Sequence, residues 1–374
     1  MTELKTIYLD NAASTPVKSG VLEKFNEVAQ NLYGNPSSTH TVGIMARDAI
    51  WDAQEIIANK INCNVDELFF TSGATMSNNL LIQGVMRNRP ETMFITTMVE
   101  HNDIMELYDW LPYSKYMVRV DSEGLLDYDD LYKQLIYCEE NNKPCLISIQ
   151  MANSETGVEQ PIKFLSRIIH KHGGYLHVDA TQYIPYYPID IEDLNIDALS
   201  MSGQKIGGIK GSGLLYVRKT LQQYVSPIIF GEQGLIGGTP STPLIASLGE
   251  AFKELDYNTL SMEHKRDMFL NFLKDMGGIL IGSESIRLPN NIYIRFPGVD
   301  GMTLLNILNE YGICIGTGSA CSTDSDRASH VALAYGLTEQ EAFECVRFTL
   351  SNENTYEDLE YVIETLGSVL KLLR

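Results

Sequence analysis

Two stretches decide the fold prediction: Tyr175-Leu-His-Val-Asp179-Ala-Thr-Gln182 and Ser200-Met-Ser202-Gly-Gln-Lys205. In each, a run typical of a buried strand ends on a charged group, and the lysine also precedes several glycines. An isolated charge is costly to bury, so both groups need partners. A pyridoxal phosphate ring satisfies both, because Lys205 forms an imine with its aldehyde and Asp179 keeps its ring nitrogen protonated. A Lys–Asp ion pair beside a glycine-rich hairpin satisfies them equally well.

Around these stretches, β-rich runs alternate with helical patterns through the first two thirds of the chain. Such alternation is typical of βα units on a mainly parallel sheet, which places the chain in the α/β class. The same patterning predicts helices over 44–60 and 162–172, the second one stopped by Gly173-Gly174. Strands are predicted over 67–71, 93–97, 145–150, 175–179, 197–201 and 214–217.

A second region begins after about residue 255, with strands predicted over 292–295 and 312–316. The chain ends in an amphipathic helix whose apolar residues from Leu359 to Leu373 follow the 3.6-residue period. Thr355 and Asp358 form a capping box at its start. We assign this apolar stripe to core packing and give it no chemistry.

Composition excludes several function classes. The 374 residues carry 48 acidic and 28 basic side chains, a net charge of −20 that repels nucleic acid and anionic membranes. No apolar run approaches the ~20 residues that span a bilayer. The first ten residues do not resemble a signal peptide, so we expect a cytoplasmic protein.

The six cysteines form no C-x-x-C pair, so we expect neither disulfides nor a metal site. Cys321 lies in the small-residue segment Gly316-Thr-Gly-Ser-Ala-Cys321-Ser-Thr, which suits a mobile nucleophile, although a lone cysteine is more often a small buried hydrophobe. We assign the other five cysteines to that second class. The segment Ser72-Gly-Ala-Thr75-Met-Ser leads into an apolar helix and suits either a phosphate site or a simple N-cap turn.

Taken together, eight ordered motifs resemble the cysteine desulfurases of the NifS/IscS branch of the class V aminotransferase family, over nearly the whole chain. The motifs are Tyr8-Leu-Asp-Asn-Ala-Ala-Ser-Thr-Pro16, Gly34-Asn-Pro-Ser-Ser-Thr-His40, Thr71-Ser-Gly-Ala-Thr75, Glu100-His101, Val178-Asp-Ala-Thr-Gln182, Ser202-Gly-Gln-Lys205, Gly318-Ser-Ala-Cys321 and Arg347-Phe-Thr-Leu350.

This resemblance implies a fold type I transferase dependent on pyridoxal 5'-phosphate. Residues 14–255 would form the large cofactor domain, and 1–13 with 256–374 a smaller α+β domain. The implied reaction converts L-cysteine to L-alanine and leaves its sulfur as a persulfide for a sulfur-acceptor protein, either an iron–sulfur scaffold or a tRNA thiolation enzyme. Two alternatives stay open: a selenocysteine lyase or other eliminating enzyme, and a weakly active or silent paralogue that acts as an interaction protein.

The resemblance also implies roles for individual residues. Lys205 would bond to the cofactor and move protons, His101 would stack on the ring, and Cys321 would be the nucleophile. Thr239 would reach the phosphate of a second subunit, which implies a homodimer, and Arg347 and Asn35 would lie near the substrate, with Arg347 clamping its carboxylate. The other predicted cofactor contacts are Ala74, Thr75, Asn153, Ser154, Asp179, Gln182, Ser202 and Gln204.

Four positions depart from the family pattern. Met76 replaces a glutamate, Gln204 a histidine and Ile236 an arginine. Ser154 replaces an asparagine near the ring hydroxyl, and the adjacent Asn153 is a candidate substitute. Each lost neutral hydrogen bond weakens cofactor binding by about 1 kcal/mol. We therefore expect a divergent but active enzyme.

Overall fold

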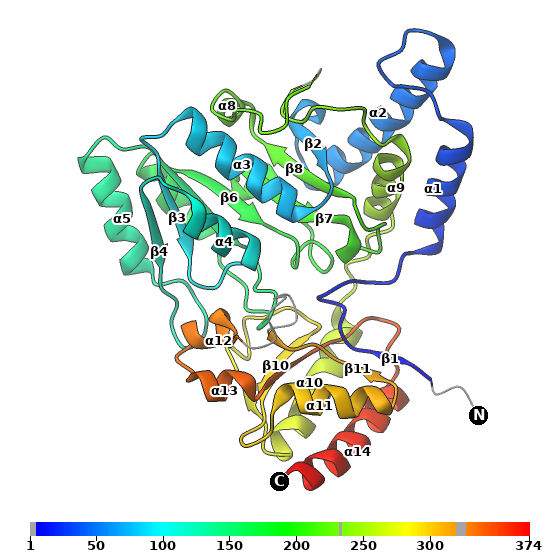
Figure 1. Ribbon diagram of the computed structural model, residues 1–374, viewed down its shortest axis with the longest axis vertical. Helices are drawn as coiled ribbons and strands as arrows, with labels where there is room; N and C mark the ends of the chain where they lie inside the picture. The colour runs from blue at the N-terminus through cyan, green and yellow to red at the C-terminus, as the bar shows by residue number, and fades with distance from the viewer. Residues whose placement is uncertain (1–4, 232–233, 319–326) are drawn as a thin grey trace.

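A seven-stranded sheet forms the larger part of the molecule (Figure 1). The computed structural model describes residues 5–231, 234–318 and 327–374. The strands of this sheet are β2 (Leu68–Thr71), β3 (Met93–Thr97), β4 (Lys115–Val118), β5 (Cys145–Gln150), β6 (Tyr175–Asp179), β7 (Ala198–Ser202) and β8 (Gly213–Val217). Their order is β2-β8-β7-β6-β5-β3-β4, parallel from β7 to β4, with β8 antiparallel to both neighbours. The predicted mainly parallel α/β sheet is confirmed.

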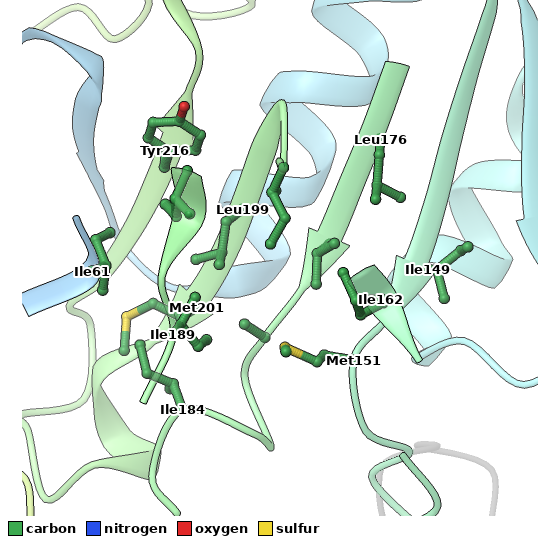
Figure 2. Packing of buried hydrophobic residues seen from close by; sticks show 14 of the residues in the cluster. Ile61, Ile149, Met151, Ile162, Leu176, Ile184, Ile189, Leu199, Met201 and Tyr216 are labelled. Carbon is green, nitrogen blue, oxygen red and sulfur yellow. The ribbon is translucent and has the colours of Figure 1, made fainter. Parts of the chain in front are cut away.

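Helices cover both faces of this sheet, which explains why its strands are apolar at successive positions. In β3, Met93 and Ile95 enter one core cluster and Phe94 enters the cluster on the other face. Figure 2 shows part of the first of these clusters, which includes Leu176 and Leu199 of neighbouring strands and Ile162 and Ile61 of the covering helices. The helices of this part are α1 (Ser19–Asn31), α2 (Thr41–Ile61), α3 (Ala74–Asn88), α4 (Asn102–Trp110), α5 (Tyr128–Glu140), α6 (Ile162–Lys171), α7 (Ile191–Leu194), α8 (Lys219–Gln222) and α9 (Thr242–Lys253).

The rest of the chain forms a smaller mixed unit below the sheet in Figure 1. Its antiparallel sheet runs β12 (Cys345–Thr349), β10 (Asn291–Arg295), β9 (Ile279–Leu280), and a parallel pair joins β1 (Ile7–Tyr8) to β11 (Ile313–Cys314). The N-terminal segment therefore belongs to the core of this unit, although we keep the boundaries at 14 and 255 as a proposal. Its helices are α10 (Leu260–Asp275), α11 (Gly301–Glu310), α12 (His330–Ala334), α13 (Glu339–Phe343) and α14 (Tyr356–Leu373).

The predicted helices are confirmed with small shifts at their ends, and α14 begins with the expected capping box of Thr355 and Asp358. Glu67 lies in a 3-10 turn before β2 instead of in the strand. Sequence patterning missed β4, which is an edge strand that starts on a lysine, and β12, whose apolar run is interrupted by Arg347. No helix among the described residues is long and apolar enough to cross a membrane.

Candidate active site

A cavity of about 230 Å³ lies where the carboxyl ends of β5, β6 and β7 face the smaller unit. This is the edge at which parallel sheets bind ligands, because the loops after the strands converge there. Ten of the predicted site residues line the cavity: Ala74, Thr75, His101, Ser154, Asp179, Gln182, Ser202, Gln204, Lys205 and Arg347. Sequence positions spread over more than two hundred residues therefore meet in one place.

One end of the cavity is the N-terminus of α3. Gly73 precedes the helix with a φ of 152°, and a Cβ at Gly213 would collide with the Gly73 backbone, so glycines at both positions let the chains approach closely. The first turn of α3, all of which the structure describes, holds no acidic side chain. Ser202 lies against Gly73 and Thr75 lines the same wall. Unshielded backbone N–H groups with two hydroxyls suit a phosphate.

Asp179 lies at the end of β6, nine-tenths buried. Its carboxylate accepts hydrogen bonds from Asn78 Nδ2 at 3.1 Å and from the Thr181 N–H at 3.0 Å, neither of which carries charge. Burial and the nearby Asp103 charge raise the pKa of Asp179 above its ordinary value. A cationic N–H placed in the cavity would stabilise this carboxylate as an anion.

A fully buried histidine supports that position from within the sheet. His177, two residues before Asp179, bridges Ser148 at 2.8 Å and Ser200 at 2.9 Å, one from each neighbouring strand. Burial lowers the pKa of His177 to about 3, so its imidazole is neutral. The bridge cross-links β5, β6 and β7 and holds the end of β6 in register.

Lys205 follows β7 in a short 3-10 turn over Gly203–Lys205. Its ammonium donates to the carbonyls of Ala12 at 2.5 Å and Ala13 at 2.7 Å, and Gln182 Nε2 donates to the Ala12 carbonyl at 3.0 Å. These contacts bring the N-terminal segment across the cavity. The amine thus lies on the cavity wall, held by exchangeable hydrogen bonds.

Arg347 reaches the cavity from β12 of the smaller unit and is 3% exposed. Its Nη2 donates to Asp10 Oδ1 at 2.7 Å and its Nη1 to the Ser154 carbonyl at 2.9 Å. Among the described residues, its buried Nε has no hydrogen-bond partner. A guanidinium with one N–H unmet and one neighbouring N–H on a carboxylate suits a substrate carboxylate, because the fork binds two oxygens at once.

Sequence reasoning missed two residues that connect the site. Asn78 donates to Asp103 as well as to Asp179, and Asp103 in turn binds His101 Nδ1 at 2.8 Å. A signal for Asn78 exists in the sequence, since it is an amide on an otherwise apolar helix face, one turn after Thr75. Asp103 is marked only by its position two residues after His101.

Of the other four predicted residues, three lie in the described part of the chain and do not line this cavity. The Asn153 side chain accepts from the Glu155 and Thr156 N–H groups of its own turn and donates to the Val99 carbonyl after β3, and it does not line the cavity, so its replacement of the missing asparagine stays a prediction without support from this geometry. Asn35 does not line the cavity, and its side chain accepts from the Ser37 N–H. Cys321 lies outside the described residues. The fourth is Thr239, placed next.

Thr239 lies in a larger neighbouring cavity of about 610 Å³, which shares Ser72 and Met76 with the first. Ile236 lines the same cavity as Met76, so two of the four positions that depart from the family pattern lie on the wall of one cavity. Both Met76 and Ile236 are apolar side chains at positions where the resemblance implies an acid and an arginine.

The residues present fit pyridoxal 5'-phosphate. The buried Asp179 carboxylate, with uncharged donors, suits a ring N–H; Lys205 suits an aldehyde; and the start of α3 suits a phosphate. Three separate requirements of one molecule are thus met on one cavity wall.

Comparisons with known proteins show similarity over nearly the whole chain. The chain is 36% identical to the cysteine desulfurase IscS of Dictyoglomus turgidum over 384 residues, covering 99% of this chain and 96% of that protein. It superposes on a NifS-like protein with a TM-score of 0.89 and 32% identity, over 98% of this chain and 100% of the other. A structure described as SspA in complex with cysteine matches with a TM-score of 0.80 and 32% identity, over 92% and 99%. The aminotransferase class-V family matches residues 7–362, and the chain belongs to this family.

Proposed function

We propose that this protein is a pyridoxal-phosphate-dependent cysteine desulfurase that converts L-cysteine to L-alanine and passes the sulfur to Cys321. The relatives named as cysteine desulfurases support this activity. The observation that carries it is the pairing, in one cavity, of a buried acid that lacks charged donors with a lysine amine. This arrangement serves an amine-bonded ring with a protonated nitrogen, and L-cysteine is the substrate class that the relatives' names indicate.

Each end of the cofactor has its own protein contacts in this proposal. Asp179 would hold the ring nitrogen, Gln182 the ring hydroxyl, and Thr75 with Ser202 the phosphate. When bound, the group withdraws electrons from the substrate Cα. Lys205 then moves the proton released at Cα, and the buried Arg347 holds the substrate carboxylate so that this carbon stays over the ring.

The proposed transfer moves the substrate sulfur to the Cys321 thiol. The Cys321 thiolate attacks the substrate sulfur, the bond from that sulfur to Cβ breaks, and Cβ takes up a proton to give alanine. The enzyme retains a persulfide on Cys321, which an acceptor protein with its own thiol removes. Cβ keeps the electron pair of the broken carbon–sulfur bond and is reduced while the two sulfurs reach the persulfide level, so no external oxidant is required.

We also propose a homodimer that acts in the cytoplasm. Thr239 lies outside this chain's own ring cavity, on the adjoining 610 Å³ cavity with the exposed Trp51 on its wall. A second copy of the chain bound there would cover this apolar surface, and Thr239 of the first copy would reach the phosphate site of the second copy. The sulfur acceptor would be an iron–sulfur scaffold or a tRNA thiolation enzyme.

A cysteine assay with two cysteine variants tests the activity. We expect the holoenzyme to release alanine from L-cysteine, and mass spectrometry to find one added sulfur on Cys321. Cys321→Ser should keep the bound cofactor and abolish sulfide release under reductant. Cys314→Ser is the matched control, because Cys314 is half-buried on β11 and its thiol pKa is raised by burial and by Asp10.

Two results contradict the proposal. Unchanged sulfide release from Cys321→Ser would remove the nucleophile assignment. Turnover of selenocysteine without any turnover of cysteine would instead identify a selenocysteine lyase, and absence of bound cofactor together with an inert Lys205→Ala would indicate a silent paralogue.

A further inference from the structure

Asp103 lies directly behind His101 on the wall of the cavity. His101 is the N-cap of α4 and Asp103 is the second residue of that helix. The His101 side chain is 38% exposed, whereas that of Asp103 is 6% exposed, with 2.8 Å between Nδ1 and Oδ1. The imidazole thus meets the cavity while the carboxylate is shielded behind it.

This contact determines where the imidazole carries its proton. The same Nδ1 also lies 3.4 Å from the Asp103 backbone N–H, but the contact with the carboxylate, at 2.8 Å, is shorter and charge-assisted, so we assign the hydrogen on Nδ1 to that contact. Nδ1 is therefore the protonated nitrogen of the neutral ring, and Nε2, on the opposite side of the ring, keeps a lone pair. Burial alone would raise the pKa of Asp103, but hydrogen bonds and charge from His101, with Asn78 and Thr75, hold it below its ordinary value.

Asn78 fixes the carboxylate from the other side. The two hydrogens of its Nδ2 go to Asp103 Oδ2 at 3.0 Å and to Asp179 Oδ2 at 3.1 Å, and Asn78 is fully buried. Asp103 therefore has one oxygen held by Asn78 and the other facing His101. The orientation of the imidazole is tied through this amide to the acid at the end of β6.

We propose that Asp103 is a positioning residue that keeps the His101 proton on Nδ1 and leaves Nε2 to exchange protons in the cavity. The catalytic consequence rests on the proposed function, whereas the proton position is a property of the protein itself. A ring with the opposite proton position would present an N–H to the cavity and could not accept a proton from the substrate.

Other charges also surround His101. They are Glu100 after β3, Glu155 after β5, Asp179 of β6, Lys205 after β7, His330 of α12 and Arg347 of β12. Burial raises the pKa of Glu100 to about 8 and that of Glu155 to about 7, which reduces their negative charge near neutral pH. Asp103 stays ionised and touches the ring, so it dominates the choice of nitrogen.

The test is Asp103→Asn with Asp103→Glu as the charge-retaining variant. In Asp103→Asn, the Asn78 N–H still requires an acceptor, so the new amide oxygen takes that place and its NH2 group faces His101 Nδ1. Nδ1 must then accept, and the ring proton moves to Nε2. Ring-nitrogen chemical shifts in histidine-labelled protein report this directly, without substrate.

We expect protonated Nδ1 in the parent protein and in Asp103→Glu, and protonated Nε2 in Asp103→Asn. In the cysteine assay, kcat should fall about tenfold with KM unchanged. Glu139→Gln, which neutralises the acid of a separate pair with His172, should leave the His101 signals unchanged.

An unchanged proton position in Asp103→Asn overturns the inference, even if that variant is less stable, because a merely structural aspartate would alter stability alone. Protonated Nε2 in the parent protein also overturns it. If the proton moves as expected but no variant turns over cysteine, the inference stands and the proposed function fails.

Discussion

Asp179 and Asp103 are both buried carboxylates that accept a hydrogen bond from the same Asn78 amide nitrogen, yet their pKa values shift in opposite directions. At the start of α4, Asp103 meets an imidazole, which holds its pKa low. At the end of β6, Asp179 has only uncharged donors, and burial raises its pKa. The difference teaches that the fold itself stabilises the ionised form of Asp103, whereas the ionised form of Asp179 is stabilised only when a cation enters the cavity.

The sharpest way to break this comparison is Asp179→Asn. An amide cannot favour a protonated ring nitrogen, so we expect desulfurase turnover to fall about 10²- to 10³-fold while part of the cofactor remains bound. Steady-state alanine release and cofactor absorbance measure the two effects. Asp197→Asn, which changes a buried acid at the opposite end of β6 and β7, should keep the cofactor absorbance and most of the turnover. Near-normal rates in Asp179→Asn would contradict the comparison.

Glu100 is a third buried acid, and like Asp179 it has hydrogen-bond donors that carry no charge. Burial raises its pKa from 4.5 to about 8, so the folded state holds a proton that the unfolded chain releases above pH 4.5. The contribution of protonated Glu100 to the free energy of unfolding is therefore fully present below pH 4.5 and is lost as the pH rises toward 8.

Glu100→Gln imitates the protonated acid and can still accept from the Gln150 N–H. We expect the variant to lose less unfolding free energy than the parent protein between pH 5 and 8, by a few kcal/mol. Denaturant titrations of both proteins at several pH values measure this. Parallel pH profiles for the two proteins would show that Glu100 is ionised in the fold.

Arg347 is a buried cation at the cavity, and its guanidinium is already bound to the Asp10 carboxylate. Arg347→Lys keeps the charge and loses the fork, so we expect KM for L-cysteine to rise about tenfold, or ~1.4 kcal/mol, with a smaller change in kcat. Arg295→Lys changes an arginine paired with Glu344 outside the cavity and serves as the control. An unchanged KM in Arg347→Lys would separate this residue from substrate binding.

The smallest expected effect is at the start of α14, where the Asp358 carboxylate is bound by the cap residue Thr355 and by the distant Lys5. Thr355 caps α14 together with this acid. Thr355→Ala should cost about 1 kcal/mol of unfolding free energy without altering turnover. Ser241→Ala, at an N-cap with no side-chain cap hydrogen bond, should cost less. Equal losses in both variants would show that the capping box contributes nothing.

Local patterning predicted most of the central sheet because its strands are apolar on both faces and its helices carry one apolar stripe. It missed β4, which starts on Lys115, β12, whose apolar run is interrupted by Arg347, and the two-residue strands β1 and β9. Arg347 is nevertheless buried, because Asp10 and the Ser154 carbonyl satisfy it from distant parts of the chain. No local pattern contains such partners.

The sequence by itself determined the α/β class, the order of the strands along the chain and the residue types after β2, β6 and β7, since these depend on spacing of only a few residues. Only the tertiary structure decided that the Asn153 amide donates to the Val99 carbonyl while the Asn78 amide joins two acids. Both residues are buried asparagines, and they differ in the donors and acceptors that the fold brings within about 3 Å of their amides. The packing of the whole chain sets those partners, and the residues next to each asparagine in sequence do not.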